Sequence, residues 1–290
     1  MKKTALVTVV FVALGAGAAP AATQPVNLLA AENFYGDVGS QIGGPSVKVT
    51  SILSNPDQDP HEFEASPSTA RAVSGARLVV YNGVDYDPWI DKLLAASPAQ
   101  GRATIVAADL AHKQSGDNPH LWYRPETMIA VAQAIAAELD QADPANKAGY
   151  DSRLQRFIAS LQPLQQKIAE LRAKYAGTMV TATEPVFGYM ADALGLQMRN
   201  MRFQMAVMND TEPSAGDVGA FEDDLKQHQV RVLFYNVQTS DDLTKRLLDL
   251  AKSSHVPVVG VSETEPAGKN YQQWMMSQLN ALQQALATPQ

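Results

Sequence analysis

The sequence predicts an α/β fold of two lobes, each with a parallel sheet flanked by helices, joined by one long backbone helix. Short apolar, strand-like runs alternate with helical segments in both halves of the chain. Such alternation is typical of parallel sheets whose crossovers are helices. Between the halves, residues 144–176 keep a helical pattern, and at 1.5 Å per residue they reach roughly 50 Å. That length suits a connection between two domains.

The first half is predicted to hold four strands and four helices. Residues 47–53 alternate apolar and polar side chains as a strand does. Ser66 and Pro67 provide a helix cap and a first-turn proline. The predicted strands are 26–31, 47–53, 77–81 and 103–107, and the predicted helices are 37–42, 66–74, 88–96 and 126–139.

Apolar periodicity and helix-ending residues also predict the elements of the linking segment and of the second half. An apolar stripe runs through Ile158, Leu161 and Leu164, and Pro163 inside it predicts a kink near 159–160. Two separate helices meeting at the proline are the alternative. Gly195 is the expected end of a helix. The predicted strands are 179–183, 231–235 and 256–261, and the predicted helices are 187–194, 214–227, 241–253 and 271–286.

The first residues have the pattern of an export signal. Lys2 and Lys3 precede a small apolar stretch, and Ala19-Pro20-Ala21 fits the cleavage rule of signal peptidase. The stretch is short for a membrane span, although an N-terminal anchor is the alternative. We expect a signal peptide at 1–21, a first lobe at 22–143, the linking helix at 144–176 and a second lobe at 177–290.

Composition narrows the class of partner and the compartment. The net charge is −7 and no basic stripe is visible, which argues against nucleic acid. The chain has no cysteine, so it has no disulfide, no thiolate ligand and no site for lipid attachment. An exported protein without an anchor is retained only by a second membrane. We therefore expect a soluble monomer in the periplasm.

Four side chains mark a candidate metal site. His61 and His120 each follow a proline in a polar loop after a predicted strand of the first half. Glu184 and Glu263 directly follow predicted strands of the second half. Ligands of open parallel sheets bind at the carboxyl ends of strands. Two imidazoles and two carboxylates from facing sheets would form a cage for a divalent ion.

Other interpretations of these residues stay open. Glu184 and Glu263, taken alone, suit carboxylates near helix N-termini. Glu62 and Glu265 compete with them as ligands. The remaining histidines lie in polar helical or turn contexts and are expected at the surface or behind the ligands: His112, His228 and His255.

Four segments resemble a known family. Residues 59–67 (DPHEFEASP) resemble the D-P-H-x-[FY]-x-x-[ST]-P signature of the zinc/manganese-type (cluster A-I) substrate-binding proteins of bacterial ABC transporters. Residues 118–122 (NPHLW) and 183–189 (TEPVFGY) resemble the second and third motifs of that family. Residues 261–264 (VSET) lie where the family supplies a fourth ligand, usually Asp. The resemblance covers nearly the whole mature chain.

The resemblance implies a carrier and not an enzyme. Such a protein captures a divalent transition metal between its lobes and delivers it to the permease of an ABC importer in the inner membrane. The implied ligands are His61, His120, Glu184 and Glu263, with Glu265 as the alternative to Glu263. Two histidines with two carboxylates resemble the manganese carriers of the family, so Mn²⁺ is favoured and Zn²⁺ follows closely.

The sequence departs from the family pattern at one strand end, and other functions remain as alternatives. Asn236 stands at a strand end where the family often has Glu, which bears on how the ligands are oriented. A periplasmic metal-dependent hydrolase would activate water on an open metal position, but the sequence has no HExxH motif. A metal-storage or adhesion protein is a further alternative.

Overall fold

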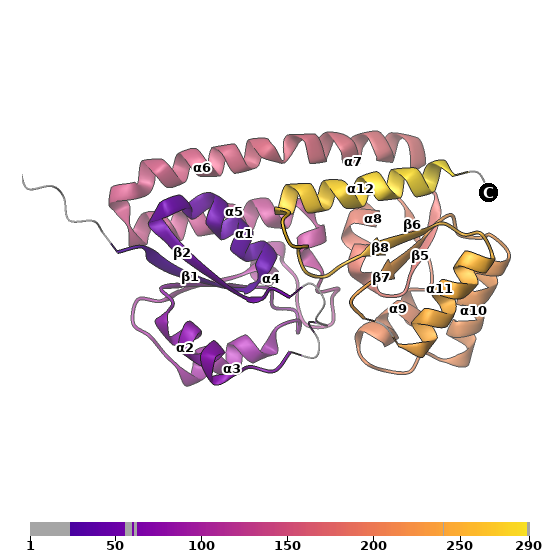
Figure 1. Ribbon diagram of the computed structural model, residues 1–290, viewed down its shortest axis with the longest axis horizontal. Coiled ribbons are helices and arrows are strands. Elements are labelled where there is room, and N and C mark those ends of the chain that lie inside the picture. Colours follow the sequence, from indigo (N-terminus) through magenta and orange to yellow (C-terminus); the bar gives the residue numbers. More distant parts are fainter. Residues whose placement is uncertain (1–23, 56–59, 61–62, 240, 289–290) are drawn as a thin grey trace, which may run out of the picture.

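The computed structural model describes residues 24–55, 60, 63–239 and 241–288 (Figure 1). The predicted signal peptide at 1–21, His61 and Glu62 lie outside the described residues. Within these residues the chain forms two four-stranded parallel sheets, of order β2-β1-β3-β4 and β6-β5-β7-β8. The strands are β1 Val26–Glu32, β2 Val47–Leu53, β3 Leu78–Tyr81, β4 Ala103–Val106, β5 Met179–Ala182, β6 Gln197–Met198, β7 Leu233–Asn236 and β8 Val258–Val261.

Alternation along β1 explains how the first sheet is covered on both faces. Leu28 belongs to a core that includes side chains of α1 (Asn33–Gly43) and α5 (Pro125–Ala142). Leu29 points to the opposite face and packs with side chains of α2 (Pro67–Gly75) and α3 (Pro88–Ala96). Successive strand residues face opposite sides of a sheet, so both faces are buried.

The linking helix is interrupted where the proline requires it. It consists of α6 (Lys147–Ser160) and α7 (Gln162–Tyr175), which Figure 1 draws as one nearly continuous rod along the top of the molecule. Pro163 lies in the first turn of α7 and has no N–H to donate to the turn before it. The break therefore falls at Leu161, just beyond the predicted 159–160.

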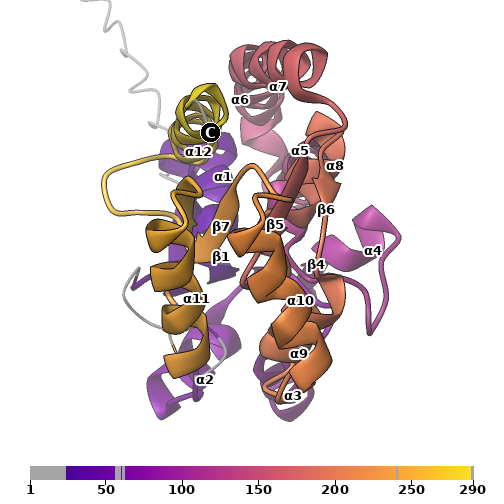
Figure 2. The ribbon, with the colours of Figure 1, turned by 90° about the vertical axis from the view of Figure 1, so that its right-hand side faces the viewer.

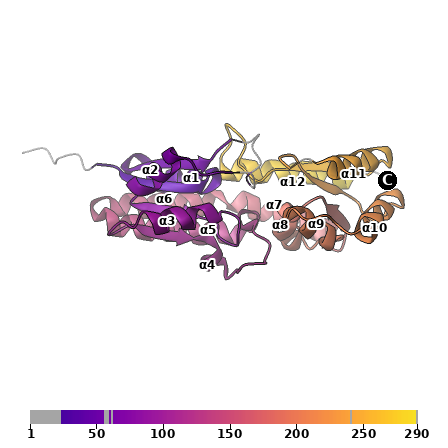
Figure 3. The ribbon, with the colours of Figure 1, turned by 90° about the horizontal axis from the view of Figure 1, so that it is seen from below.

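The two lobes share one core beneath this rod. The closing helix α12 (Tyr271–Ala287) runs alongside α7 (Figures 1 and 3). Buried side chains of α1, α5, α7, α8 (Gly188–Leu194) and α12 form a single apolar cluster that reaches both sheets. Packing as well as chain connection therefore holds the lobes together. Among the described residues, no helix has the length and apolar character needed to cross a bilayer.

The outer face of the second sheet carries three helices. These are α9 (Met201–Met208), α10 (Ala215–Lys226) and α11 (Asp242–Ser253), which lie toward the viewer in Figure 2. Phe203, Phe221 and Leu247 join them in a separate small core. Gly195 ends α8 at a φ of 67°, as predicted, because a left-handed residue without a Cβ costs little there.

Several element predictions need correction. Helix α1 begins at Asn33, four residues before the predicted start, because Phe34 and Tyr35 are already buried in the core. The prediction missed β6, α4 (Ala107–Ala111) and α9. The first two are too short to show a period, and α9 spans barely two turns.

Candidate metal centre

The second sheet places three polar residues side by side at its carboxyl edge. Ala182 pairs with Phe234, so Glu184, two residues further on, lies level with Asn236 at the end of β7. Asn236 pairs in turn with Val261 of β8, two residues before Glu263. Strand register therefore brings together residues that are far apart in sequence.

His120 enters from the first lobe, in the loop between α4 and α5, and its side chain is fully buried. Its Nδ1 lies 2.7 Å from Asn118 Oδ1, which also accepts the backbone N–H of His120 at 3.1 Å. Asn118 Nδ2 donates to Pro185 O at 2.7 Å, which fixes the orientation of the amide. The proton of the imidazole therefore sits on Nδ1, and Nε2 is the nitrogen with the lone pair.

The histidine and one carboxylate meet across the lobes. Nε2 of His120 lies 3.5 Å from Glu263 Oε2, and both side chains are buried. The hydroxyl of Tyr86 donates to the same oxygen at 3.1 Å. Tyr86 and Trp122 pack against the imidazole at ring-centre distances of 6.2 and 5.2 Å. The aromatic surroundings keep water from this contact, in which two electron-pair donors, Nε2 and Oε2, lie close together.

Asn236 connects the two carboxylates of the second lobe. Its Nδ2 donates to Glu184 Oε2 at 3.1 Å and to Glu263 Oε1 at 2.6 Å. Glu184 and Glu263 are both almost completely buried. An amide donor between two carboxylates reduces their mutual repulsion. His120, Glu184 and Glu263 thus belong to one connected group.

Further hydrogen bonds tie the carboxylate loops to the first lobe. The hydroxyl of Tyr123 donates to Ser262 O at 2.9 Å. The amide of Asn33 pairs with the backbone of Glu265, donating to its O at 2.8 Å and accepting from its N at 2.9 Å. The segment that follows β8 is therefore held by the lobe that carries His120.

The alternatives named from the sequence lie differently. Glu265 sits two residues beyond Glu263, and burial with the nearby charge of Asp37 raises its pKa to about 9. The backbone N–H and carbonyl of Glu265 are both bound to the side chain of Asn33 in the first lobe. For the loop of His61, the described neighbours are Pro60, which is buried, and Phe63, whose ring packs on Trp89 at 4.7 Å. Within the described ranges, no three His, Asp or Glu side chains have the spacing of a metal site.

The other three histidines all sit just past helix ends in the left-handed region. Their φ values are 54°, 53° and 57° for His112, His228 and His255. This position usually takes glycine, because the Cβ of other residues is strained there. These histidines end helices.

A buried acidic pair lies behind the site in the first lobe. Asp87 accepts the backbone N–H groups of Asn82 and Gly83 at 2.6 and 2.8 Å, which favours its charged form. Burial nevertheless raises the pKa of Asp87 to about 6. Burial and the charge of Asp87 raise the pKa of Glu32 well above its usual range, so Glu32 carries the proton. No sequence pattern had singled out this pair.

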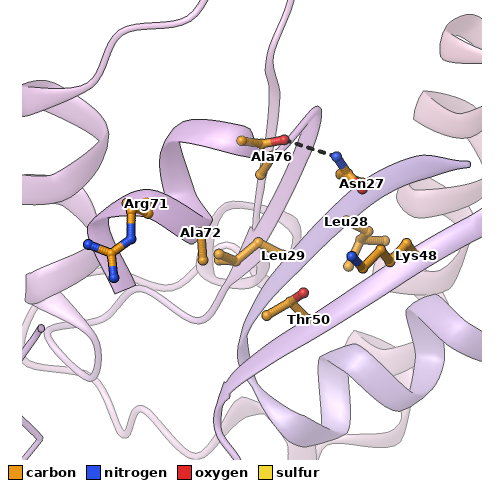
Figure 4. Close-up of a pocket in the computed structure, with 9 residues that line it drawn as sticks. Asn27, Leu28, Leu29, Lys48, Thr50, Arg71, Ala72 and Ala76 are labelled. Carbon is orange, nitrogen blue, oxygen red and sulfur yellow. Dashed lines mark hydrogen bonds between the residues drawn. The ribbon is translucent and has the colours of Figure 1, made fainter. Parts of the chain in front are cut away.

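A separate hollow of about 170 Å³ lies between β1, β2 and α2 (Figure 4). Lys48 and Arg71 are among its lining residues, and Asn27 Nδ2 donates to Gly75 O at 3.3 Å beside it. It lies at the amino ends of β1 and β2, away from the carboxylates. Two cationic side chains disfavour a metal ion there.

Comparison with known proteins agrees with this architecture. A family model described as zinc-uptake complex component A, periplasmic (ZnuA), matches residues 29–285, and the chain belongs to this family. The manganese ABC transporter substrate-binding lipoprotein PsaA of Streptococcus pneumoniae is 25% identical, over 93% of this chain and 92% of that protein. The family consists of substrate-binding proteins of transporters, not of enzymes.

Solved structures share the fold. The periplasmic zinc-binding protein TroA of Treponema pallidum superposes with a TM-score of 0.78 at 17% identity, covering 92% of this chain and 100% of that one. The Mn-bound periplasmic metal-binding protein of Candidatus Liberibacter asiaticus gives a TM-score of 0.71 at 18% identity, covering 90% and 99% of the two chains. The predicted two-lobed α/β fold is therefore confirmed.

Proposed function

We propose that this protein captures one divalent transition-metal ion between its lobes and delivers it to the permease of an ABC importer. The observation that carries the proposal is the meeting of His120 with Glu263 across the lobes, with Asn236 joining Glu263 to Glu184. Family membership supports the same role. The proposed ligands are His120, Glu184 and Glu263, completed by His61.

The donor set suits the charge and chemistry of such a cargo. Two carboxylates balance the charge of a divalent ion, and this lowers the free-energy cost of burying the ion. Nε2 of His120 offers its lone pair because Asn118 holds the proton on Nδ1. Nitrogen and carboxylate donors suit Mn²⁺ and Zn²⁺ alike; the two carboxylates favour Mn²⁺ as the physiological cargo, with Zn²⁺ as its competitor.

Capture and release follow from the way the lobes are joined. His120 belongs to the first lobe and the carboxylates to the second, so an ion bound to both stabilises their contact. Separation of the lobes at the permease would remove donors from the ion and lower its affinity. Protons compete for the histidines, so metal affinity should fall below about pH 6.

The cellular setting belongs to the same proposal. A signal peptide at 1–21 would bring the chain to the periplasm, where it acts as a monomer. The matched PsaA is named a lipoprotein, whereas this chain has no cysteine to carry a lipid. Its lobes would be 22–143 and 177–290, with 144–176 between them.

The test is a calorimetric titration of the mature, chelator-stripped protein with Mn²⁺ and with Zn²⁺. We expect one tight site per chain, lost in both His61→Ala and Glu263→Ala. Glu265→Gln serves as the matched control two residues away and should bind as the wild type does. Unchanged binding in the His61 and Glu263 variants would refute the proposed site.

A further inference from the structure

Three methionines form a stripe along α9 in the second lobe. Met201, Met205 and Met208 are spaced by four and then three residues, so they lie on one face of the helix. Phe203 and Val207 of the same helix belong to the small core shared with α10 and α11. None of the three methionines belongs to an apolar core formed by the described residues. Core packing therefore does not account for the stripe.

The stripe can be reached from solution. Met201 is 41% exposed, and Met205 and Met208 are partly buried. Figures 1 and 2 show α9 on the side of the second lobe remote from the linking rod. Every large apolar side chain of α9 that is not fully buried is a methionine. A small ion in solution therefore has access to a row of thioether groups.

Methionine is also concentrated in this part of the sequence. Four of the ten methionines fall between residues 198 and 208, and the chain has no cysteine. Leucine has a similar volume and fills the same apolar space, so apolar character alone does not explain the repeated use of methionine. The thioether adds a soft, polarisable sulfur on a flexible side chain. The stripe is thus the main accumulation of soft donors in the chain.

The helix that carries the stripe is anchored at its start. Asn200 Nδ2 donates to Thr181 Oγ1 at 3.2 Å and to Asp224 Oδ2 at 2.9 Å. Asp224 is almost completely buried and also accepts two hydrogen bonds from Arg199, at 2.7 and 2.8 Å. On a helix, Cβ atoms at these spacings are about 5–6 Å apart. Flexible methionine side chains can span such a separation to reach one shared ion.

We propose that Met201, Met205 and Met208 bind one soft monovalent ion, Cu⁺ or Ag⁺, through their three thioether sulfurs. Soft thioether donors select Cu⁺, whereas carboxylates suit harder divalent ions. The site uses none of the ligands of the candidate metal centre, so it adds a second kind of metal to the proposed function. A thioether has no proton to lose on binding, so affinity for Cu⁺ should not fall below about pH 6 as that of a histidine site does.

The first experiment uses the wild-type mature protein with ¹³C-labelled methionine methyl groups. Ag⁺ serves as the probe because it shares the preference of Cu⁺ for sulfur and is stable in air. We expect Ag⁺ to shift the methyl signals of Met201, Met205 and Met208 and to leave those of the buried methionines in place. This measurement needs no variant to fold. Unchanged signals at the three positions would contradict the proposal.

The second experiment titrates Cu⁺ anaerobically against a chromophoric Cu⁺ chelator. The test variant combines Met201→Leu, Met205→Leu and Met208→Leu, which keep the apolar volume and remove the sulfurs. We expect one Cu⁺ per chain in the wild type, none in this variant, and unchanged Zn²⁺ binding in both. A matched control replaces three fully buried methionines and should keep Cu⁺ binding: Met128→Leu, Met190→Leu and Met275→Leu.

X-ray absorption of the Cu⁺-loaded wild type should show sulfur donors alone. Nitrogen or oxygen donors, Cu⁺ binding retained by the stripe variant, or Cu⁺ affinity that falls below about pH 6 would overturn the proposal and place the ion at a histidine site instead. A wild type that binds neither Cu⁺ nor Ag⁺ would overturn it as well, and the stripe would then be an apolar contact surface. None of these outcomes affects the proposed capture of a divalent ion.

Discussion

The two sheets have the same strand order and the same residue types at equivalent strand ends, yet only one of them presents carboxylates to the candidate site. In the first sheet Ala30 pairs with Val80, so Glu32 lies level with Asn82. In the second sheet the same offset from a paired alanine brings Glu184 level with Asn236. Each Glu and Asn pair thus marks the point where the strand order reverses, which is where open sheets bind ligands.

Neighbouring residues give the two pairs different tasks. Glu32 lies beside Asp87 and keeps a proton, whereas Glu184 lies beside an amide donor. Asn82 Nδ2 donates to Pro119 O, next to His120, and so supports the histidine loop rather than a carboxylate. Sheet topology therefore sets where a site can form. The neighbouring hydrogen-bond donors and charges determine which of the two sheets carries the ionised carboxylates.

The largest expected effect separates the two glutamates directly. Glu184→Gln should weaken metal binding by at least ~100-fold, because it removes the charge of a proposed ligand and not only a residue that supports one. Glu32→Gln should leave the affinity within a few fold, because Glu32 is already neutral. Isothermal titration with Zn²⁺ measures both. An equal loss of metal affinity in the two variants would contradict the assignment of the metal-binding carboxylate to the second sheet alone.

A smaller effect is expected at Gly188, the first residue of α8. A Cβ there would lie 2.8 Å from Asn118 Nδ2, so Gly188→Ala should displace the amide that orients His120. We expect roughly 10-fold weaker metal binding, although alanine suits a helix better than glycine does. Gly219→Ala, where an added Cβ meets nothing within 4 Å, is the control. Full affinity in Gly188→Ala would contradict the role of Asn118.

The buried acidic pair predicts how stability depends on pH. Burial raises the pKa of Asp87 to about 6 and that of Glu32 further, so the folded state keeps protons that the unfolded state releases. Their stabilising contribution is full below about pH 4 and is lost as the pH rises through 6 and beyond. Thermal unfolding of the chelator-stripped protein should show the melting temperature falling over this range.

Glu32→Gln should flatten that decline, since the amide carries no titrating proton. Glu212→Gln, at an exposed position, should leave the profile unchanged. A melting temperature that rises with pH in the wild type, or an unaltered profile in Glu32→Gln, would show that the pair does not hold the proton assigned to it.

The smallest effect concerns the helix ends. His228→Gly and His255→Gly should each stabilise the fold by up to about 1 kcal/mol, because glycine adopts the left-handed conformation without strain. Gly195→Ala, at a similar φ, should destabilise by a comparable amount. Denaturant unfolding measures all three. Destabilisation in both histidine variants would indicate that these side chains do more than end helices.

The sequence was sufficient for the layers of the fold and for the strand-end position of the candidate ligands. Alternating periods locate the long elements, and His120, Glu184 and Glu263 stand directly after them or in the loops they define. The short helix α9 was not predicted, because two turns are too few to establish a helical period in the sequence.

The residues that hold the candidate ligands in place could not be predicted from the sequence pattern. The bond from Asn118 to Pro185 and the bridge made by Asn236 join segments separated by up to 67 residues. Such contacts depend on strand register and on how the lobes pack, which a linear pattern does not contain. Asn236, at a strand end where the family often has Glu, was the one visible signal, and its meaning required its neighbours.

Crystals of the mature protein loaded with Zn²⁺, measured on both sides of the zinc absorption edge, test the central claim most directly. The account predicts a single anomalous peak per chain within bonding distance of His120 Nε2, Glu263 Oε2 and one oxygen of Glu184, with His61 as the fourth ligand. A peak bound by Glu265 in place of Glu263, or one remote from His120, would contradict it.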